Sequence, residues 1–133
     1  MSKEFINPST HFSSDRAYSK AIKFDIGDSK ILFIAGQISK NETGEVVGLG
    51  DYTKQTEYIF EKLGMILEEA GMGLNDLVKV NIYVTDMREF DKVSIVRDKF
   101  LRDSKPVSTA VAVNGTVTNG CDVEIDGIAI KKK

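Results

Sequence analysis

The sequence has very few of the residues from which metal centres and disulfides are built. Its 133 residues include one cysteine, Cys121, one histidine, His11, and no tryptophan. A single cysteine excludes an internal disulfide and any site with several thiolate ligands, and it suits a reducing compartment. No stretch approaches the ~18 apolar residues that a membrane-spanning helix needs. We therefore predict no metal, no cofactor and no membrane contact.

An excess of charge of one sign is lacking as well. The net charge is −2, and basic residues form a run only at Lys131, Lys132 and Lys133. Such a chain has no general attraction for phosphate backbones, so we predict no nucleic-acid partner. The N-terminal segment MSKEFINP lacks the apolar core of a signal peptide. We expect one domain spanning residues 1–133, located in the cytoplasm.

Two segments have the apolar periodicity of helices. Residues 51–70 carry an apolar stripe at helical spacing, with Asp51 as the expected N-cap. The stripe consists of Ile59, Leu63, Ile66 and Ala70. A second helix is expected over residues 87–102, with Phe90, Val93, Val96 or Arg97, and Phe100 on its inner side.

The remaining regular segments have the pattern of strands. Apolar and polar residues alternate over 78–84, while 31–35 is an unbroken apolar run that suits a central strand. Residues 18–24, 107–113 and 122–130 complete the set. This order of strands and helices predicts an α+β fold, a sheet with both helices packed on one face.

Residues 107–113 raise the question of what covers the other face of that sheet. β-branched side chains alternate there with the small residues Ser108, Ala110 and Ala112, which suggests a strand buried on both sides. The two helices can cover only one side. Because monomers rarely leave a large apolar face in water, we predict that the bare face packs against another copy of the chain.

Three blocks of the sequence resemble the RidA/YjgF family of small imine and enamine deaminases. They are DLVKVNIYVTDMREF at 76–90, IAGQI followed by TGEV over 34–46, and VEIDGIA at 123–129. The blocks stand in the family's order at similar spacing, so the resemblance covers nearly the whole chain. It implies a chorismate-mutase-like mixed sheet with two helices on one face, assembled as a homotrimer with ligand clefts between neighbouring subunits.

The resemblance also implies which residues line those clefts. Tyr18 matches a pocket tyrosine, Gly36 a glycine whose backbone N–H faces the ligand, and Glu124 the glutamate that positions the attacking water. Four other positions depart from the family pattern. Ala35 replaces a serine, Ser94 an asparagine, Ser108 an arginine and Ala110 a cysteine.

The loss of the arginine at Ser108 bears most directly on function. In the family this arginine binds the substrate carboxylate through a bidentate pair, which a serine cannot replace. Either the chain no longer acts on the standard 2-imino acids, or another cation has taken over. Arg16 is the first candidate for that cation, and Arg102 and Lys105 flank the other side of the cleft.

Two functions from different classes remain open at this point. The first is a trimeric enzyme that deaminates a small imine or enamine, with Glu124 as its tentative catalytic residue. The second is a non-catalytic trimer that binds a small metabolite, such as a carboxylate, keto acid or imine, in the same clefts. An endoribonuclease activity, also attached to the family, ranks third because the chain lacks a basic stripe. We interpret His11 as a loop residue, since no nucleophile motif accompanies it.

Overall fold

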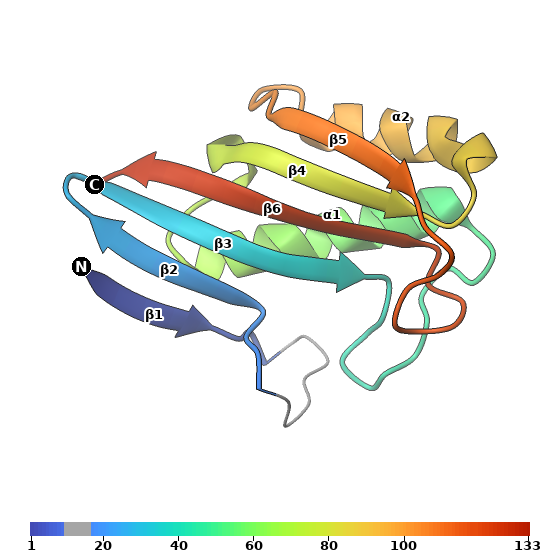
Figure 1. Ribbon diagram of the computed structural model, residues 1–133, viewed down its shortest axis with the longest axis horizontal. Coiled ribbons are helices and arrows are strands. Elements are labelled where there is room, and N and C mark those ends of the chain that lie inside the picture. The colour runs from blue at the N-terminus through green and yellow to red at the C-terminus, as the bar shows by residue number, and fades with distance from the viewer. Residues whose placement is uncertain (10–16) are drawn as a thin grey trace.

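A computed structural model describes residues 1–9 and 17–133, whose strands form one sheet (Figure 1). The strands are β1 (Ser2–Ile6), β2 (Ala21–Ile26), β3 (Ser29–Ile38), β4 (Leu77–Val84), β5 (Val107–Ala112) and β6 (Val123–Lys132). The helices are α1 (Tyr52–Glu69) and α2 (Phe90–Phe100), and the short 3-10 helices η1 (Leu74–Asp76) and η2 (Met87–Glu89) precede β4 and α2.

The sheet has six strands in the order β1-β2-β3-β6-β4-β5. Every neighbouring pair is antiparallel except β4 and β5, which run parallel because α2 connects them. Both helices lie behind the sheet in Figure 1 and leave the other face open. The predicted α+β fold, with a mixed sheet and two helices on one face, is confirmed.

The first helix follows its prediction closely. Asp51 is its N-cap, and the Asp51 carboxylate accepts a hydrogen bond of 3.0 Å from the Lys54 backbone N–H. The predicted apolar stripe is buried against the sheet. Gly71 follows the helix with a φ of 76°, a left-handed conformation that favours glycine.

The second helix is shorter than predicted. Met87–Glu89 forms a 3-10 turn, because the Asp86 side chain accepts a hydrogen bond from the Arg88 backbone N–H and tightens the start. α2 ends at Phe100, whose ring stacks on Phe60 of α1 at 5.2 Å between centroids. The chain must then turn back toward β5, so residues 101 and 102 leave the helix.

The strand at residues 18–24 was predicted too early in the chain. β2 begins at Ala21, and Tyr18 lies in the preceding loop with 66% of its surface exposed. β1 was not predicted, and its residues are exposed apart from Ile6. An exposed edge strand buries too little apolar surface to produce a clear alternation in sequence.

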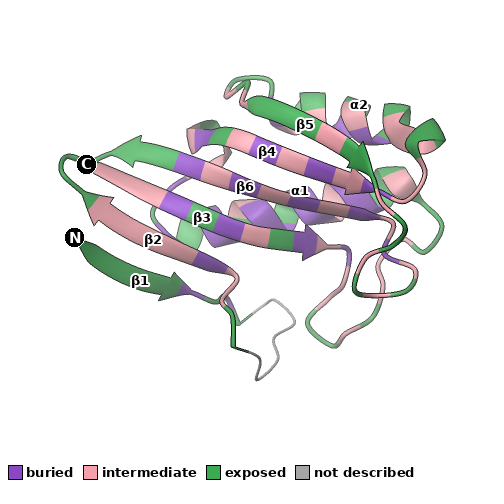
Figure 2. Cartoon of the chain, viewed as in Figure 1, coloured by how far each residue is buried: buried purple, intermediate pink, exposed green. Residues whose placement is uncertain are grey.

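The single chain does not cover residues 107–113 on both sides, so the predicted cover by another copy of the chain stays a prediction. β5 is an edge strand, and every residue in it except Ala110 is exposed (Figure 2). Ala110 alone packs against the core. The open face of the sheet also exposes apolar side chains, including Phe33 at 48% and Ile130 at 43%.

None of the described helices has both the length and the apolar character needed to cross a membrane.

A buried glutamine ties α1 to the loop that precedes β6. Gln55 is fully buried, and its amide nitrogen donates to the backbone carbonyls of Gly48 at 3.0 Å and Gly120 at 2.9 Å. Its amide oxygen accepts a hydrogen bond from the Asp122 backbone N–H at 2.8 Å. These bonds pair three backbone groups and hold the loop that carries Thr118 in place.

Replacing Gln55 by methionine is expected to destabilise the protein. Methionine fills a similar volume but leaves the three backbone groups without a partner, which costs about 2 kcal/mol or more of unfolding free energy. Urea unfolding followed by circular dichroism measures the loss. Thr53→Ala, an exposed change on the same helix, serves as the control. Equal midpoints for the two variants would contradict the assigned role of Gln55.

Candidate functional site

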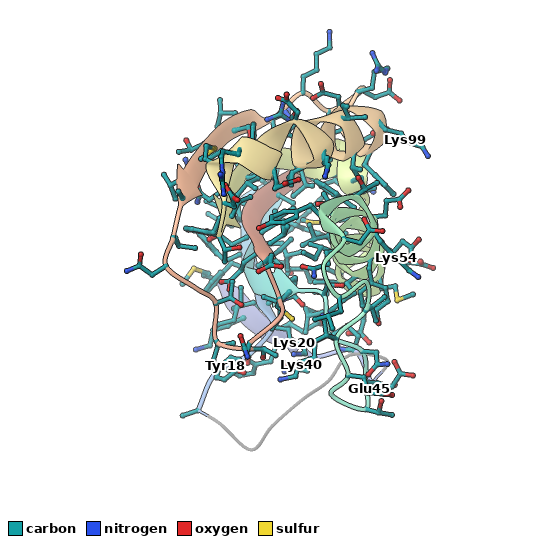
Figure 3. All side chains as sticks on the ribbon, turned by 90° about the vertical axis from the view of Figure 1, so that its right-hand side faces the viewer. Tyr18, Lys20, Lys40, Glu45, Lys54 and Lys99 are labelled. Carbon is teal, nitrogen blue, oxygen red and sulfur yellow. The ribbon has the colours of Figure 1, made fainter. Side chains whose placement is uncertain are left out.

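A cavity of about 810 Å³ lies at one end of the sheet, where β3 and β6 meet the loops around them. Four of the residues predicted for the site line it: Tyr18, Ala35, Gly36 and Glu124. Val117 and Thr118, from the loop between β5 and β6, close another side. Figure 3 shows Tyr18 next to Lys20 and Lys40 at this end of the molecule. The structure therefore brings together residues that are as much as 106 positions apart in the chain, Tyr18 and Glu124 (124 − 18 = 106).

A bulge in β3 makes room for the Glu124 carboxylate. Ile34 pairs with Gly127 and Gln37 with Ile125, so that Ala35 and Gly36 lie together opposite Asp126. A Cβ atom added to Gly36 would lie only 2.8 Å from the Cδ of Glu124. A larger residue at this position would displace the Glu124 carboxylate from its place in the cavity.

Glu124 is partly buried beside a second carboxyl group. Partial removal from water raises the pKa of its carboxyl above the ordinary value, and the negative charge of Asp126 on the same face raises it further. Asp126 itself accepts hydrogen bonds of 2.8 Å from the Asn81 amide and the Tyr83 hydroxyl. A carboxyl that faces a cavity can accept a proton from water and return it to a bound molecule.

Three lysines among the described residues that were not predicted for the site also line the cavity: Lys20, Lys40 and Lys62. Lys62 of α1 is buried, and its ammonium donates to the carbonyls of Ile38 at 2.9 Å and Lys40 at 3.1 Å. Burial and, to a smaller extent, the nearby charge of Lys20 lower the pKa of Lys62 to about 8. Lys40 donates to the Thr118 hydroxyl at 3.0 Å.

A signal for Lys62 was present in the sequence. It lies three residues after Ile59 and four before Ile66, which places it within the apolar stripe of the first helix. A charged residue on such a stripe is buried, and a buried ammonium needs oxygen partners.

The other predicted site residues lie elsewhere on the chain. Ser108 lines a second cavity, of about 350 Å³, together with Arg102 and Lys105. Ser94 is on α2 and donates to the carbonyl of its own helix at Asp91 over 3.1 Å. Ala110 is packed against the core, so it lies in neither cavity lining. Arg16 and His11 lie outside the described residues.

The residue in contact with Ser108 is Arg97, one of the two alternatives expected on the inner side of the second helix; the other, Val96, is the buried one. The Arg97 guanidinium lies 3.5 Å from the Ser108 hydroxyl through Nη1. Its identity as a site residue could not be read from sequence, because its distance from Ser108 depends on how α2 packs beside β5.

Cys121 is a buried residue of the core side and has no place in the cavity lining. Its thiol is buried and points at the Ser39 carbonyl, 3.6 Å away, and burial raises the pKa of the Cys121 thiol. Within the described part of the chain, no group of three histidine, cysteine, aspartate or glutamate side chains is placed to hold a metal ion.

Comparison with known proteins identifies the family. The family model described as Endoribonuclease L-PSP matches residues 9–131. A RutC family protein of Pyrococcus abyssi is 41% identical over 116 residues, covering 86% of this chain and 87% of the relative. This chain belongs to the RidA/YjgF family.

Further relatives show how widely the family fold is shared. A Yersinia pestis protein of unknown function, from the conserved Rid family, superposes with a TM-score of 0.85 at 28% identity, covering 96% of this chain and 98% of that one. The mouse protein named 2-iminobutanoate/2-iminopropanoate deaminase is 27% identical over 114 residues, covering 86% of this chain and 81% of its own length. The family resemblance inferred from the three sequence blocks is thus confirmed.

The pH dependence of stability tests the environment of Glu124. A carboxyl whose pKa is higher in the folded than in the unfolded state, where it is near 4.5, stabilises the fold fully below that value. The contribution is lost as pH rises through the folded pKa. We therefore expect the unfolding free energy of Glu124→Gln to increase relative to that of the wild type as pH rises from 4.5 through the folded pKa. Unfolding free energies measured at several pH values check this.

The exposed change Glu42→Gln controls for the loss of one negative charge. A constant difference between Glu124→Gln and wild type across the pH series would contradict the burial of the Glu124 carboxyl.

Proposed function

We propose that this chain is a RidA-like enzyme that hydrolyses small reactive imines or enamines, with Glu124 positioning and activating water. The supporting observation is the cavity in which the bulge at Gly36 holds a partly buried Glu124 carboxyl beside Tyr18. The imine deaminase name of the mouse relative favours the same reaction class. The cytoplasmic location and the single domain over residues 1–133 remain predictions.

The proposed reaction is an addition followed by an elimination. Water attacks the imine carbon, its oxygen forms the new C–O bond, and Glu124 accepts the proton that water loses. When the imine enters protonated, this gives a neutral carbinolamine. Glu124 then returns its proton to the nitrogen, and the C–N bond breaks as the hydroxyl oxygen forms the C=O bond and gives up its own proton to the departing ammonia. Imine and water are thereby converted to ketone and ammonia, with no net change in oxidation state. A carboxyl with a raised pKa suits both proton transfers.

We also propose that the protein acts as a homotrimer with the active cleft between subunits. Two observations support this. The open face of the sheet exposes Phe33, Val111 and Ile130, which a single chain leaves in water. The family positions at Tyr18 and Ser108 lie in two separate cavities of one chain, so a cleft that holds both requires a second copy.

A second candidate is a non-catalytic trimer that binds a small carboxylate or keto acid in the same place. The residues Ala35, Ser94, Ser108 and Ala110 favour this second candidate. They stand where the family pattern has serine, asparagine, arginine and cysteine, so larger polar or reactive groups are missing. The name of the family model also includes ribonuclease activity, but the scattered basic residues of this chain form no stripe that could follow an RNA backbone.

Release of ammonia from enzymatically generated 2-iminobutanoate tests the catalytic proposal. Wild type should exceed the buffer rate, and Glu124→Gln should lose ~10²-fold or more of that excess, the usual contribution of a general base. Gly36→Ala should lose activity through displacement of the carboxylate, while Gly64→Ala, in a helix with open space around it, should retain it. A wild-type rate equal to buffer, with a keto acid still binding, would favour the non-catalytic candidate.

Sedimentation tests the assembly. Wild type should sediment as a trimer, and Phe33→Asp should shift it toward the monomer, because a charge at this exposed position would have to be buried in the interface. Met65→Asp places the same charge at an exposed apolar position on the outer side of α1, and it should leave the trimer intact. Circular dichroism confirms that each variant is folded. A wild-type monomer at high concentration would overturn the trimeric cleft.

A further inference from the structure

The second cavity of the chain carries a concentration of positive charge. It lies between the end of α2 and the start of β5, and its volume of about 350 Å³ suits a small ligand. Its charged lining consists of Arg97, Arg102, Lys105 and one acid, Asp98. Ser108 lies on its wall. The lining therefore favours an anion.

Arg97 is the most firmly oriented of these cations. Its Nε donates to the Asp98 carboxylate at 3.0 Å, and its guanidinium carbon lies 5.7 Å from the centroid of the Phe90 ring. Only 24% of the Arg97 side chain is exposed. A guanidinium held from two directions loses little further freedom when it binds a ligand, which strengthens binding.

The hydrogen bonds of Arg97 leave its two Nη groups able to bind a ligand. Asp98 takes only the Nε proton, and Nη1 makes a long contact of 3.5 Å with the Ser108 hydroxyl. Arg88 provides a contrast, since its Nε and Nη2 both bind the same Asp86 carboxylate, at 3.0 and 2.9 Å. Within residues 1–9 and 17–133, Nη2 of Arg97 has no such acceptor. The two Nη groups can therefore take a carboxylate in bidentate fashion.

The small residue at 108 is a condition of this arrangement. Because Nη1 lies 3.5 Å from the Ser108 hydroxyl, a longer side chain at 108 would have to share the space beside the guanidinium. An arginine on β5 and Arg97 in its present position would compete for the same volume. Ser108 and Arg97 thus form a matched pair.

We propose that Arg97 binds the carboxylate of the substrate in this chain, supplying from α2 the charge that β5 lacks at Ser108. The proposal rests on the function proposed above and narrows its substrate class to small 2-imino or 2-oxo acids. Arg102 and Lys105 line the same cavity and add to its attraction for the anion.

Binding of 2-oxobutanoate to the full chain, measured by calorimetry and thermal shift, tests the proposal without requiring catalysis. Wild type should bind 2-oxobutanoate and not butanone, which has no carboxylate. Arg97→Ala should weaken binding at least ~30-fold, as loss of a charge-paired partner does. Arg88→Ala, an arginine already paired with Asp86, should bind as wild type does.

A rescue variant excludes a general loss of structure. In the double variant Arg97→Ala, Ser108→Arg, the new side chain can occupy the vacated space, and binding should return. Arg97→Lys keeps the positive charge but loses the two parallel N–H donors of the guanidinium, so it should bind 2-oxobutanoate weakly. Undiminished binding by Arg97→Ala, or no binding by wild type, would overturn the proposal.

The two proposals fail in different ways. If wild type releases no ammonia yet binds 2-oxobutanoate through Arg97, the catalytic function is wrong and the binding assignment stands. If wild type releases ammonia and Arg97→Ala does so with the same kcat and KM, the function stands and the assignment to Arg97 is wrong.

Discussion

The pairing of β6 between β3 and β4 is the constraint on which the rest of the structure depends. β6 is the last strand in the chain but lies in the middle of the sheet, so the sheet is complete only when the C-terminal residues join it. Its alternate residues Val123, Ile125 and Ala129 are fully buried on the helix side. A shift of register by one residue would bury Glu124 and Asp126 in the core, at a cost that specifies the register strongly.

Once that register is set, the chemistry of the open face follows from it. Glu124 must emerge beside β3, where the bulge at Ala35 and Gly36 leaves space for it. Asp126 must emerge two residues further on, where Asn81 and Tyr83 of β4 donate to it. Glu124 therefore sits in partial burial next to a second carboxyl group, and both burial and this neighbour raise the pKa of Glu124.

Charge is arranged differently in the two cavities. Around Glu124 the cations are lysines; Lys62 donates to two backbone carbonyls and Lys40 to Thr118, and these bonds support the loops of the site. Around Ser108 the leading cation is Arg97, which is oriented by Asp98 and Phe90. The proposed cleft would join the two when copies of the chain assemble, with the general base from one side and the anion-binding group from the other.

Much of this organisation was accessible from the sequence, and the physical reason is local periodicity. The apolar stripe of the first helix, its Asp51 cap and the strand alternation over 78–84 each depend on neighbouring residues, so the α+β fold could be predicted. The three sequence blocks identified the family, and they directed attention to Tyr18, Gly36 and Glu124. The edge strands of the sheet were harder to predict. β1 was missed, and β5 was expected to be covered but is exposed in the single chain, because burial at an edge depends on what lies beside it.

The sequence by itself determined the fold class, the family and the absence of an arginine at position 108. Only the tertiary structure decided which residues meet in each cavity. Lys62 reaches the loop after β3 because α1 crosses behind the sheet, and Arg97 reaches Ser108 because α2 packs beside β5. Contacts of this kind join residues on different elements, and their distances depend on helix packing that no local pattern of side chains encodes.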